Sequence, residues 1–359
     1  MRVGIITYHS TRNCGAVLQS YALNKVVSDL GYKCEIIDYK CENIEKAYKI
    51  KKIYELRSIK EFIKWGLLVH TQKKSQKEFD KFTKENLKIS RVYNKDNITD
   101  ANKEFDAFIT GSDQVWNFNL NGADENYILN FAKEDKIKLS YAASLGYKTI
   151  PKNYTHIFKE NLTTFNAISV REEEGLESLK ELGHNSELVL DPTLLLKKED
   201  YYKFVNHNKN GDYIFVYTVA NTPNIYKKAL ELSEKTGYPV IWAHMNFMNK
   251  KGVLNLKNPS CIEFLTLLNN AKYVLTSSFH GMALSIVLNK EFFYDLSVSP
   301  NNHNSRLTTL ASSLSLTERE MKENKELSIN EKIDYEKIEQ LLNEKRRESI
   351  DFLIKGLGK

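Results

Sequence analysis

The sequence predicts an α/β protein made of two Rossmann-like, doubly wound domains that face each other. Short apolar, β-prone runs alternate with helical patterns along the chain, and this alternation occurs in both halves. The predicted strands end in polar or glycine residues, which is typical of parallel sheets that form a ligand crevice at one edge. A chain of 359 residues, 42% hydrophobic and 27% charged, is sufficient for two soluble domains with their own cores.

The first domain is predicted to begin with a βαβ unit. Strands at residues 2–7 and 33–38 flank a helix at residues 16–30, which Gly31 ends. The unit lacks the G-x-G-x-x-G fingerprint of dinucleotide-binding proteins, which argues against a nicotinamide enzyme. Further strands of this domain are expected at residues 105–110, 138–143, 167–170 and 188–190.

The second domain repeats the alternation after Pro192. We therefore expect the first domain at residues 1–192 and the second at residues 193–329. Residues 330–359 carry a long, charged, amphipathic helix that is expected to cross back to the first domain. The second domain's strands are expected at residues 213–219, 239–243, 273–276 and 291–295, and its helices include residues 225–236 and 260–270.

Residues 42–100 are expected to form a basic helical insertion in the first domain. Lysines and an arginine alternate there with apolar and aromatic residues, among them Tyr54, Phe62 and Trp65. One interpretation is an insertion that packs on its own domain. The alternative is a helix that lies on an anionic membrane through its basic and aromatic side chains.

Charge and cysteine content narrow the classes of function. A net charge of +6 is too mild to indicate nucleic acid as a partner, but it suits anionic substrates or an anionic membrane surface. The four cysteines show no metal-like pairing, so we expect no metal site. With no signal peptide or membrane span evident, the chain is expected to be cytoplasmic, with peripheral contact at the inner face of the membrane under the second interpretation of the insertion.

The stretch at residues 271–289 is predicted to be a strand, a polar turn and a helix. Its turn contains Ser277, Ser278 and His280, at a point where free backbone N–H groups attract anions. A histidine there can bind a phosphate or move a proton near neutral pH. The alternative is a serine cluster that caps the helix beside a surface histidine.

Seven short stretches occur in one order along the chain, between residue 2 and about residue 319, and skip the basic insertion. They are GIITYHSTRNCGAVLQ at 4–19, ITGSDQVW at 109–116, SYAASLG at 140–146, ISVREEEG at 168–175, VLDPT at 189–193, TSSFHG at 276–281 and NSR at 304–306. Together these stretches resemble the polysaccharide pyruvyl transferase family.

The resemblance implies a GT-B-like fold, with the acceptor on the side of the first domain and the donor on the side of the second. It implies transfer of pyruvate from phosphoenolpyruvate onto two hydroxyls of one sugar, which forms a cyclic ketal and releases phosphate. Family members act on capsular or cell-wall glycans, often on lipid-linked intermediates. No cofactor is expected beyond phosphoenolpyruvate itself.

The resemblance also implies roles for individual residues. His280 would bind phosphate or transfer a proton, and Arg171 would bind the anionic donor. Asp113, at the end of a predicted strand, would be the acidic residue of the first domain that faces the acceptor and takes part in catalysis, with Ser112 beside it as a substrate-binding candidate. The alternatives are a salt bridge between Arg171 and residues 172–174, and a turn or capping role for Asp113.

The remaining candidates surround this set. His9, Arg12 and Asn13 of the first loop are candidates for the acceptor site, whereas Cys14 is not expected to act as a nucleophile. Many relatives carry an arginine two residues before the histidine, and here that place is Ser278. Arg306 is the nearest motif-borne candidate for the missing cation, although a structural role for it is the stronger interpretation.

Two other classes of function fit the same fold. A glycosyltransferase that uses a nucleotide sugar would bind a nucleoside diphosphate tightly in the second domain. A non-catalytic module would bind an anionic glycan without turnover.

Overall fold

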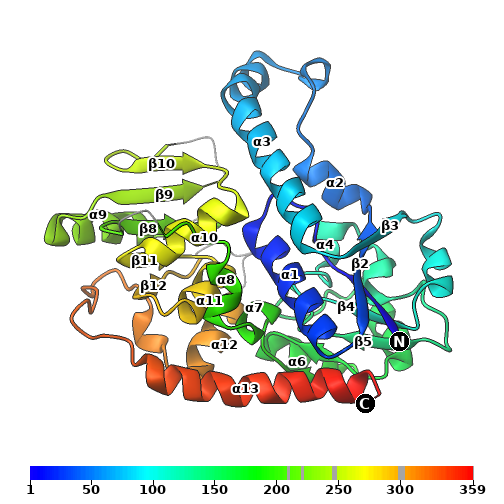
Figure 1. Cartoon of the computed structure of the whole chain (residues 1–359). Coiled ribbons are helices and arrows are strands. Elements are labelled where there is room, and N and C mark those ends of the chain that lie inside the picture. Colours follow the sequence, from blue (N-terminus) through cyan, green and yellow to red (C-terminus); the bar gives the residue numbers. More distant parts are fainter. Residues whose placement is uncertain (208–210, 220–221, 245–248, 298–303, 359) are drawn as a thin grey trace. The chain divides into compact units, whose positions relative to one another are not determined.

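The computed structural model describes residues 1–207, 211–219, 222–244, 249–297 and 304–358 (Figure 1). The chain divides into two compact units. Unit 1 contains Met1–Ala47, Thr83–Leu196 and Lys337–Lys359, and unit 2 contains Tyr48–Phe82 and Lys197–Glu336.

Unit 1 is built on a parallel five-stranded sheet with the order β3-β2-β1-β4-β5, which is the Rossmann strand order without its sixth strand. Apart from Arg2, all residues of the central strands β1 and β4 are buried, as expected for parallel strands covered on both faces. The strands are β1 (Arg2–Ile6), β2 (Lys33–Tyr39), β3 (Ile89–Tyr93), β4 (Ala107–Thr110) and β5 (Ile137–Ser140), and a small parallel pair follows, β6 (Ser169–Val170) and β7 (Glu187–Leu188).

The helices of unit 1 connect these strands. They are α1 (Cys14–Asp29), α2 (Glu42–Tyr48), α4 (Phe118–Asn121), α5 (Thr155–Asn161), α6 (Glu173–Glu181) and α7 (Pro192–Leu195), with 3-10 turns η2 (Ile98–Lys103), η3 (Glu125–Ile128) and η4 (Leu162–Thr164). The long helix α3 (Ile59–Asn86) begins in unit 2 and ends in unit 1.

The C-terminal helix α13 (Tyr335–Gly356) packs largely within unit 1. Its Ser349 hydroxyl accepts a hydrogen bond from the Leu190 N–H at 3.0 Å, and its Arg346 Nε donates to the Leu194 carbonyl at 2.7 Å. At Gly356 an added Cβ would lie 2.3 Å from a Leu139 methyl, so a larger residue would require the Leu139 side chain of β5 to move.

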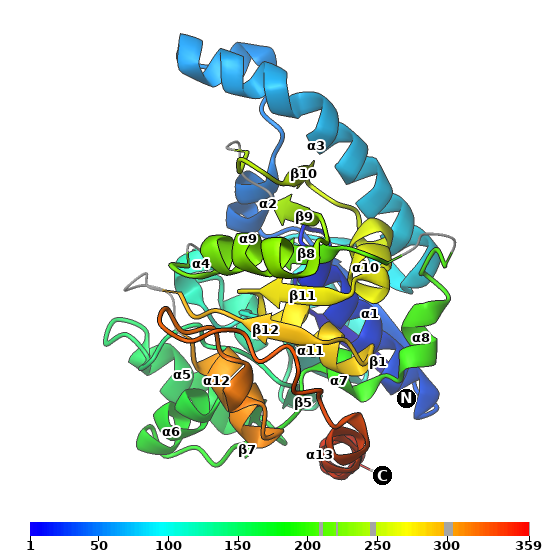
Figure 2. The ribbon, with the colours of Figure 1, turned by 90° about the vertical axis from the view of Figure 1, so that its left-hand side faces the viewer.

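Unit 2 repeats the same topology in a parallel sheet with the order β10-β9-β8-β11-β12. Helix α9 lies across this sheet and contacts β8, β9 and β11 (Figure 2). The strands are β8 (Ile214–Tyr217), β9 (Val240–His244), β10 (Leu254–Lys257), β11 (Tyr273–Thr276) and β12 (Phe292–Tyr294). The helices are α8 (Lys198–Tyr202), α9 (Ile225–Thr236), α10 (Cys261–Asn270), α11 (Phe279–Val287) and α12 (Ser305–Ser313), with 3-10 turns η1 (Ile53–Glu55) and η5 (Thr317–Arg319).

The structure differs from the sequence-based expectation in residues 42–100. This segment is not wholly helical, because β3 joins the edge of the unit 1 sheet. Its middle part, residues 48–82, groups with unit 2 rather than with the first domain. Contacts explain this, since the Phe82 and Phe204 rings lie 5.0 Å apart and Asn258 Nδ2 lies 3.5 Å from Thr71 Oγ1.

None of the helices in the described part of the chain is long and apolar enough to cross a membrane.

Candidate active site

The strand register of unit 1 places three loops at one edge of its sheet. Ile6 of β1 pairs with Thr110 of β4, and Thr110 pairs with Ser140 of β5. The loops that follow these strands therefore start at the same level, at the carboxyl edge where α/β sheets bind ligands.

The loop after β4 is held in an unusual backbone conformation. Gly111 has φ of 120°, and a Cβ there would lie 2.2 Å from the Tyr141 carbonyl oxygen. Asp113 has φ of 72°, in the left-handed region that aspartate tolerates better than most residues. Its carbonyl accepts a hydrogen bond from the Ser144 N–H at 2.9 Å. The loop is thus fixed on both sides by the loop after β5.

The Asp113 side chain lies beside Tyr8. The Tyr8 hydroxyl donates to the Gln114 carbonyl at 3.1 Å. Burial, and then the negative charge of Asp113, raise the pKa of Tyr8 well above its ordinary value. Tyr8 therefore stays a neutral phenol next to the carboxylate. The sequence analysis did not single out Tyr8, although its position before His9 in the first loop motif was an available signal.

Arg171 is the centre of a buried charge cluster. Its guanidinium lies 2.7 Å from Asp191 Oδ2, 3.3 Å from Glu172 Oε1 and 3.6 Å from Asp113 Oδ1. Burial opposes its charge, but Asp191, Glu172 and Asp113 together hold the pKa of Arg171 above its ordinary value. One cation and three carboxylates leave the cluster with a formal charge of −2.

This geometry differs from the role of donor-anion ligand that the resemblance implied for Arg171. The guanidinium side chain is only 1% exposed and is already surrounded by carboxylates, including the Glu172 partner of the alternative interpretation. Asp113 is the most exposed of the three acids at 11%, against 4% for Glu172 and 0% for Asp191. Arg171 is therefore an ion-pair partner of Asp113, and Asp113 is the most accessible acid of the cluster.

Arg171→Ala is expected to lower the free energy of unfolding by about 3–5 kcal/mol, because it leaves buried carboxylates without their counter-ion. Urea unfolding at neutral pH measures this loss. Adding Asp191→Asn to the variant should restore part of the stability, since it removes one uncompensated charge. A folded Arg171→Ala protein with unchanged stability would contradict the structural role.

Ser112 is part of an internal hydrogen-bond network. Its hydroxyl lies 2.9 Å from Asp191 Oδ2, and its N–H donates to Gln19 Oε1 at 3.1 Å. Gln19 Nε2 in turn donates to Thr7 Oγ1 at 2.9 Å, and Thr7 Oγ1 donates to the Ser112 carbonyl at 3.0 Å. Ser112 is fully buried, so the structure gives it a supporting position beneath Asp113.

His9 of the first loop contacts Asp38, an acidic residue that the sequence analysis did not single out. His9 Nε2 lies 3.0 Å from Asp38 Oδ1, and Lys40 Nζ lies 2.8 Å from the same oxygen. Asp38 lies near the end of β2, so its position in the strand was the available signal. Asn13 caps α1, with its side-chain oxygen accepting from the N–H groups of Gly15 and Ala16. Arg12 of the same loop is buried.

The Asp38 cluster should make stability depend on pH. Burial opposes the charge of Asp38, but His9 and Lys40 outweigh it and lower its pKa from 3.8 to about 2. A lowered folded-state pKa stabilises the protein above pH 4 or so, and this contribution is lost as pH falls toward about 2.

Asp38→Asn is therefore expected to lower the free energy of unfolding at pH 7 by about 1–2 kcal/mol, allowing for solvent screening at Lys40. In urea unfolding from pH 7 to pH 3, the gap from the wild-type protein should narrow as pH falls. Asp29→Asn, whose side chain is 61% exposed, is the control and should change stability little. A gap that is constant over this range would contradict the assignment.

In unit 2 the predicted strand–turn–helix of residues 271–289 is present as β11, a polar turn and α11. Ser278 is the N-cap of α11, and its hydroxyl accepts from the Gly281 N–H at 3.3 Å. Ser277 Oγ accepts from the Val219 N–H at 3.3 Å. At Gly281 a Cβ would lie 2.3 Å from Thr276 Oγ1, so the turn can close only around glycine.

His280 lies in the first turn of α11 and is buried, with 6% of the residue exposed. The serine cap of the alternative interpretation is therefore present, but the histidine beside it does not lie at the surface. Its ring contacts that of Phe279 edge to face, with centroids 5.3 Å apart. Arg306, the candidate substitute cation for which a structural role was the stronger interpretation, is half-buried in the first turn of α12.

Two further polar residues end strands of this sheet. Asp295 follows β12, and its Oδ2 accepts from the N–H groups of Asn224 and Ile225 at 2.9 Å, which stabilises the start of α9. His244 ends β9 and is 2% exposed. Sequence analysis missed His244, because a single histidine at the end of a short strand carries no motif.

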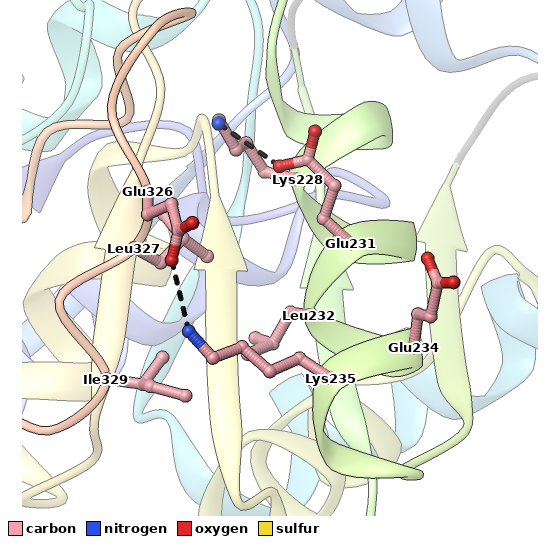
Figure 3. Close-up of a pocket in the computed structure, with 8 residues that line it drawn as sticks. All are labelled: Lys228, Glu231, Leu232, Glu234, Lys235, Glu326, Leu327 and Ile329. Atoms are coloured by element: carbon pink, nitrogen blue, oxygen red, sulfur yellow. Dashed lines mark hydrogen bonds and ion pairs between the residues drawn. The ribbon is translucent and has the colours of Figure 1, made fainter.

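A pocket of about 350 Å³ lies beside α9 and residues 326–329 of unit 2 (Figure 3). Four of its five charged residues form two ion pairs, since Lys228 pairs with Glu231 and Lys235 pairs with Glu326, each at 3.1 Å. None of the site candidates lines it. We therefore place the candidate site at the strand ends rather than in this pocket.

Within the described residues, no group of three or more histidine, cysteine or acidic side chains is arranged to hold a metal ion.

Comparison with known proteins gives a family and a fold. A family model for polysaccharide pyruvyl transferase matches residues 13–294. The curated proteins contain no match. Among solved structures, UDP-GlcNAc 2-epimerase from Methanocaldococcus jannaschii is similar over 96% of this chain and 92% of its own, with 13% identity and a TM-score of 0.51.

Two other solved structures align over similar lengths. UDP-GlcNAc 2-epimerase from Neisseria meningitidis covers 99% of this chain and 100% of its own at 11% identity, with a TM-score of 0.48. ADP-heptose LPS heptosyltransferase II from E. coli covers 97% and 99% at 10% identity, with a TM-score of 0.40. The expected GT-B-like α/β fold with two Rossmann-like parts is confirmed by the shared topology of the two sheets and the structural likeness.

Proposed function

The chain belongs to the polysaccharide pyruvyl transferase family, and we propose that it transfers pyruvate from phosphoenolpyruvate onto two hydroxyls of one glycan sugar. The product is a cyclic ketal in a capsular or cell-wall glycan. The observation that carries the proposal is the family match, which includes both the Asp113 loop and the His280 turn. Both elements lie at the carboxyl edges of parallel sheets.

The reaction needs one acid and one base. The enol carbon of phosphoenolpyruvate gains a proton, and the first sugar hydroxyl adds to the neighbouring carbon. The bond from that carbon to the phosphate oxygen then breaks, and the second hydroxyl takes its place. Two C–O bonds form, one breaks, and the two hydroxyl protons end on the methyl group and on phosphate.

The proposed roles follow from residue type and exposure. Asp113, oriented by Arg171, takes the proton from the attacking hydroxyl. His280 at the start of α11 binds the phosphate and supplies a proton, with Ser277 and Ser278 beside it. No step of this scheme requires a metal ion, and His9 is assigned to the acceptor side.

The test is phosphate release from phosphoenolpyruvate in the presence of glycan acceptors, including lipid-linked ones. The proposal predicts that release depends on an acceptor and that the acceptor gains the mass of pyruvate less one water. Carbon-13 from labelled phosphoenolpyruvate should appear as a ketal carbon. Transfer of a sugar from a nucleotide sugar to the same acceptors, without use of phosphoenolpyruvate, would overturn the proposal.

A further inference from the structure

The first turns of α3 and the segment before them carry a concentrated apolar surface. We name residues 49–67 the tip segment. The exposed large hydrophobic residues of this segment have exposed fractions from 51% at Phe62 to 80% at Ile59. Its exposed large hydrophobic residues are Ile53, Tyr54, Ile59, Phe62, Ile63 and Leu67, whereas those elsewhere in the described chain are scattered: Met1, Val92, Leu120, Leu188, Val219, Leu254 and Ile262. A contiguous exposed patch of this kind indicates an interaction site.

Helical periodicity places this patch on the face of α3 opposite to the face that carries its buried residues. Ile59, Ile63 and Leu67 follow one another at four-residue spacing, with Phe62 beside them. The buried residues of the helix, which begin with Leu68 and continue with Ser75, lie on the opposite side. In Figures 1 and 2 these first turns stand clear of the strands of unit 2.

The tip segment is also strongly basic. It contains six basic residues against the two acids Glu55 and Glu61, which gives a formal charge of +4. Both acids are engaged locally: Glu55 accepts from the Lys52 N–H at 2.7 Å, and Glu61 from the Arg57 N–H at 3.1 Å. The basic residues, all exposed, are Lys49, Lys51, Lys52, Arg57, Lys60 and Lys64.

Local contacts hold the segment in shape before any partner binds. Trp65 Nε1 donates to the Lys51 carbonyl at 2.7 Å, which ties the chain before α3 to the helix. The Phe62 ring stacks on Trp65, with centroids 6.3 Å apart. The exposed apolar side chains are therefore presented on an ordered surface.

We infer that the tip segment docks on the surface of a lipid bilayer that contains anionic lipids. The apolar side chains enter the interface between headgroups and acyl chains, and the surrounding lysines and arginine contact the anionic headgroups. A second copy of the chain is a poorer occupant, because it would bring two surfaces of charge +4 together. The idea that docking brings the enzyme to a lipid-linked acceptor rests on the proposed function. The docking itself does not depend on that function.

Vesicle binding tests the inference. Co-sedimentation is measured with vesicles of phosphatidylcholine, with and without phosphatidylglycerol. Trp65 gives a second signal, since Trp116 and Trp242 are 0% and 3% exposed and should not respond. The wild-type protein should bind only the anionic vesicles, with a blue shift of its fluorescence and with weaker binding at high salt.

Two variants separate the charge from the apolar contribution. Lys60→Glu with Lys64→Glu, and Ile59→Asn with Ile63→Asn, should each weaken vesicle binding by at least about tenfold. Because all four side chains are exposed, the thermal unfolding of both variants should match the wild type. Lys152→Glu with Lys159→Glu, two exposed lysines of unit 1, is the matched control and should bind as the wild type does.

Three results would overturn the inference. They are equal binding to neutral and anionic vesicles, retention of binding in both tip variants, and a wild-type dimer that Ile59→Asn with Ile63→Asn dissociates while vesicles are not bound. Stabilisation by phosphoenolpyruvate should be the same in all these variants. A failure of vesicle binding therefore leaves the proposed reaction standing, and a failure of phosphoenolpyruvate binding leaves the docking surface standing.

Discussion

His280→Asn is expected to lower turnover about 10²–10⁴-fold, the usual contribution of a general acid or base. Asparagine keeps a side-chain N–H that can contact phosphate but has no proton that titrates near neutral pH. The position in the first turn of α11 is set by the Ser278 cap and by the close approach at Gly281, neither of which the substitution alters. The variant should therefore fold.

Steady-state phosphate release across pH 5–9 measures this effect, with thermal unfolding as the check on folding. His156→Asn, on the half-buried surface of α5, is the matched control and should keep wild-type turnover. If His280→Asn retains near-wild-type turnover at every pH, the histidine is a packing residue of α11 and the proposed role fails.

Asp113→Asn is the second substitution with a large expected effect, again about 10²–10⁴-fold in turnover. Asparagine tolerates the left-handed backbone conformation at this position, so the loop after β4 should keep its shape. The substitution also removes one of three carboxylates from a cluster whose formal charge is −2. Stability should therefore be unchanged or slightly higher, in contrast to Arg171→Ala.

Turnover and stability of Asp113→Asn, measured together, test whether Asp113 is the reacting group. Loss of turnover with intact stability and intact phosphoenolpyruvate binding fits a base that acts on the acceptor. Asp135→Asn, an exposed acid of unit 1, is the control. Loss of turnover that tracks a loss of stability would instead assign Asp113 to the support of Arg171.

The elements predicted well from sequence are those with strong periodicity and clear ends. The central strands β1, β4, β8 and β11 are continuous apolar runs, and α9 ends at Gly237 as a helix with a left-handed cap should. The two strands that sequence analysis missed, β3 and β10, are both outermost in their sheets. Each is partly exposed and mixes polar with apolar residues, so the pattern of a buried parallel strand is absent.

The two candidate site elements could be located from the sequence, but most partners of their side chains could not. The turn at His280 and the loop at Asp113 follow strands directly, and local sequence is enough to place them at a sheet edge. Of the partners of Arg171, only the adjacent Glu172 could be predicted, because Asp191 lies 20 residues further along the chain and Asp113 lies on another loop. The bridges from Ala143 to Asp113 and to Val170, together with the pairing of β6 with β7, bring these charges together.

The central claim is that phosphoenolpyruvate is the donor, and ligand-dependent thermal unfolding tests it without knowledge of the acceptor. Phosphoenolpyruvate at about 100 times its dissociation constant should stabilise the protein by about 2.7 kcal/mol, with a saturable rise in the unfolding temperature. UDP-sugars at the same concentrations should produce no comparable shift. An unfolding temperature that is unmoved by millimolar phosphoenolpyruvate but rises with a nucleotide sugar would contradict the account.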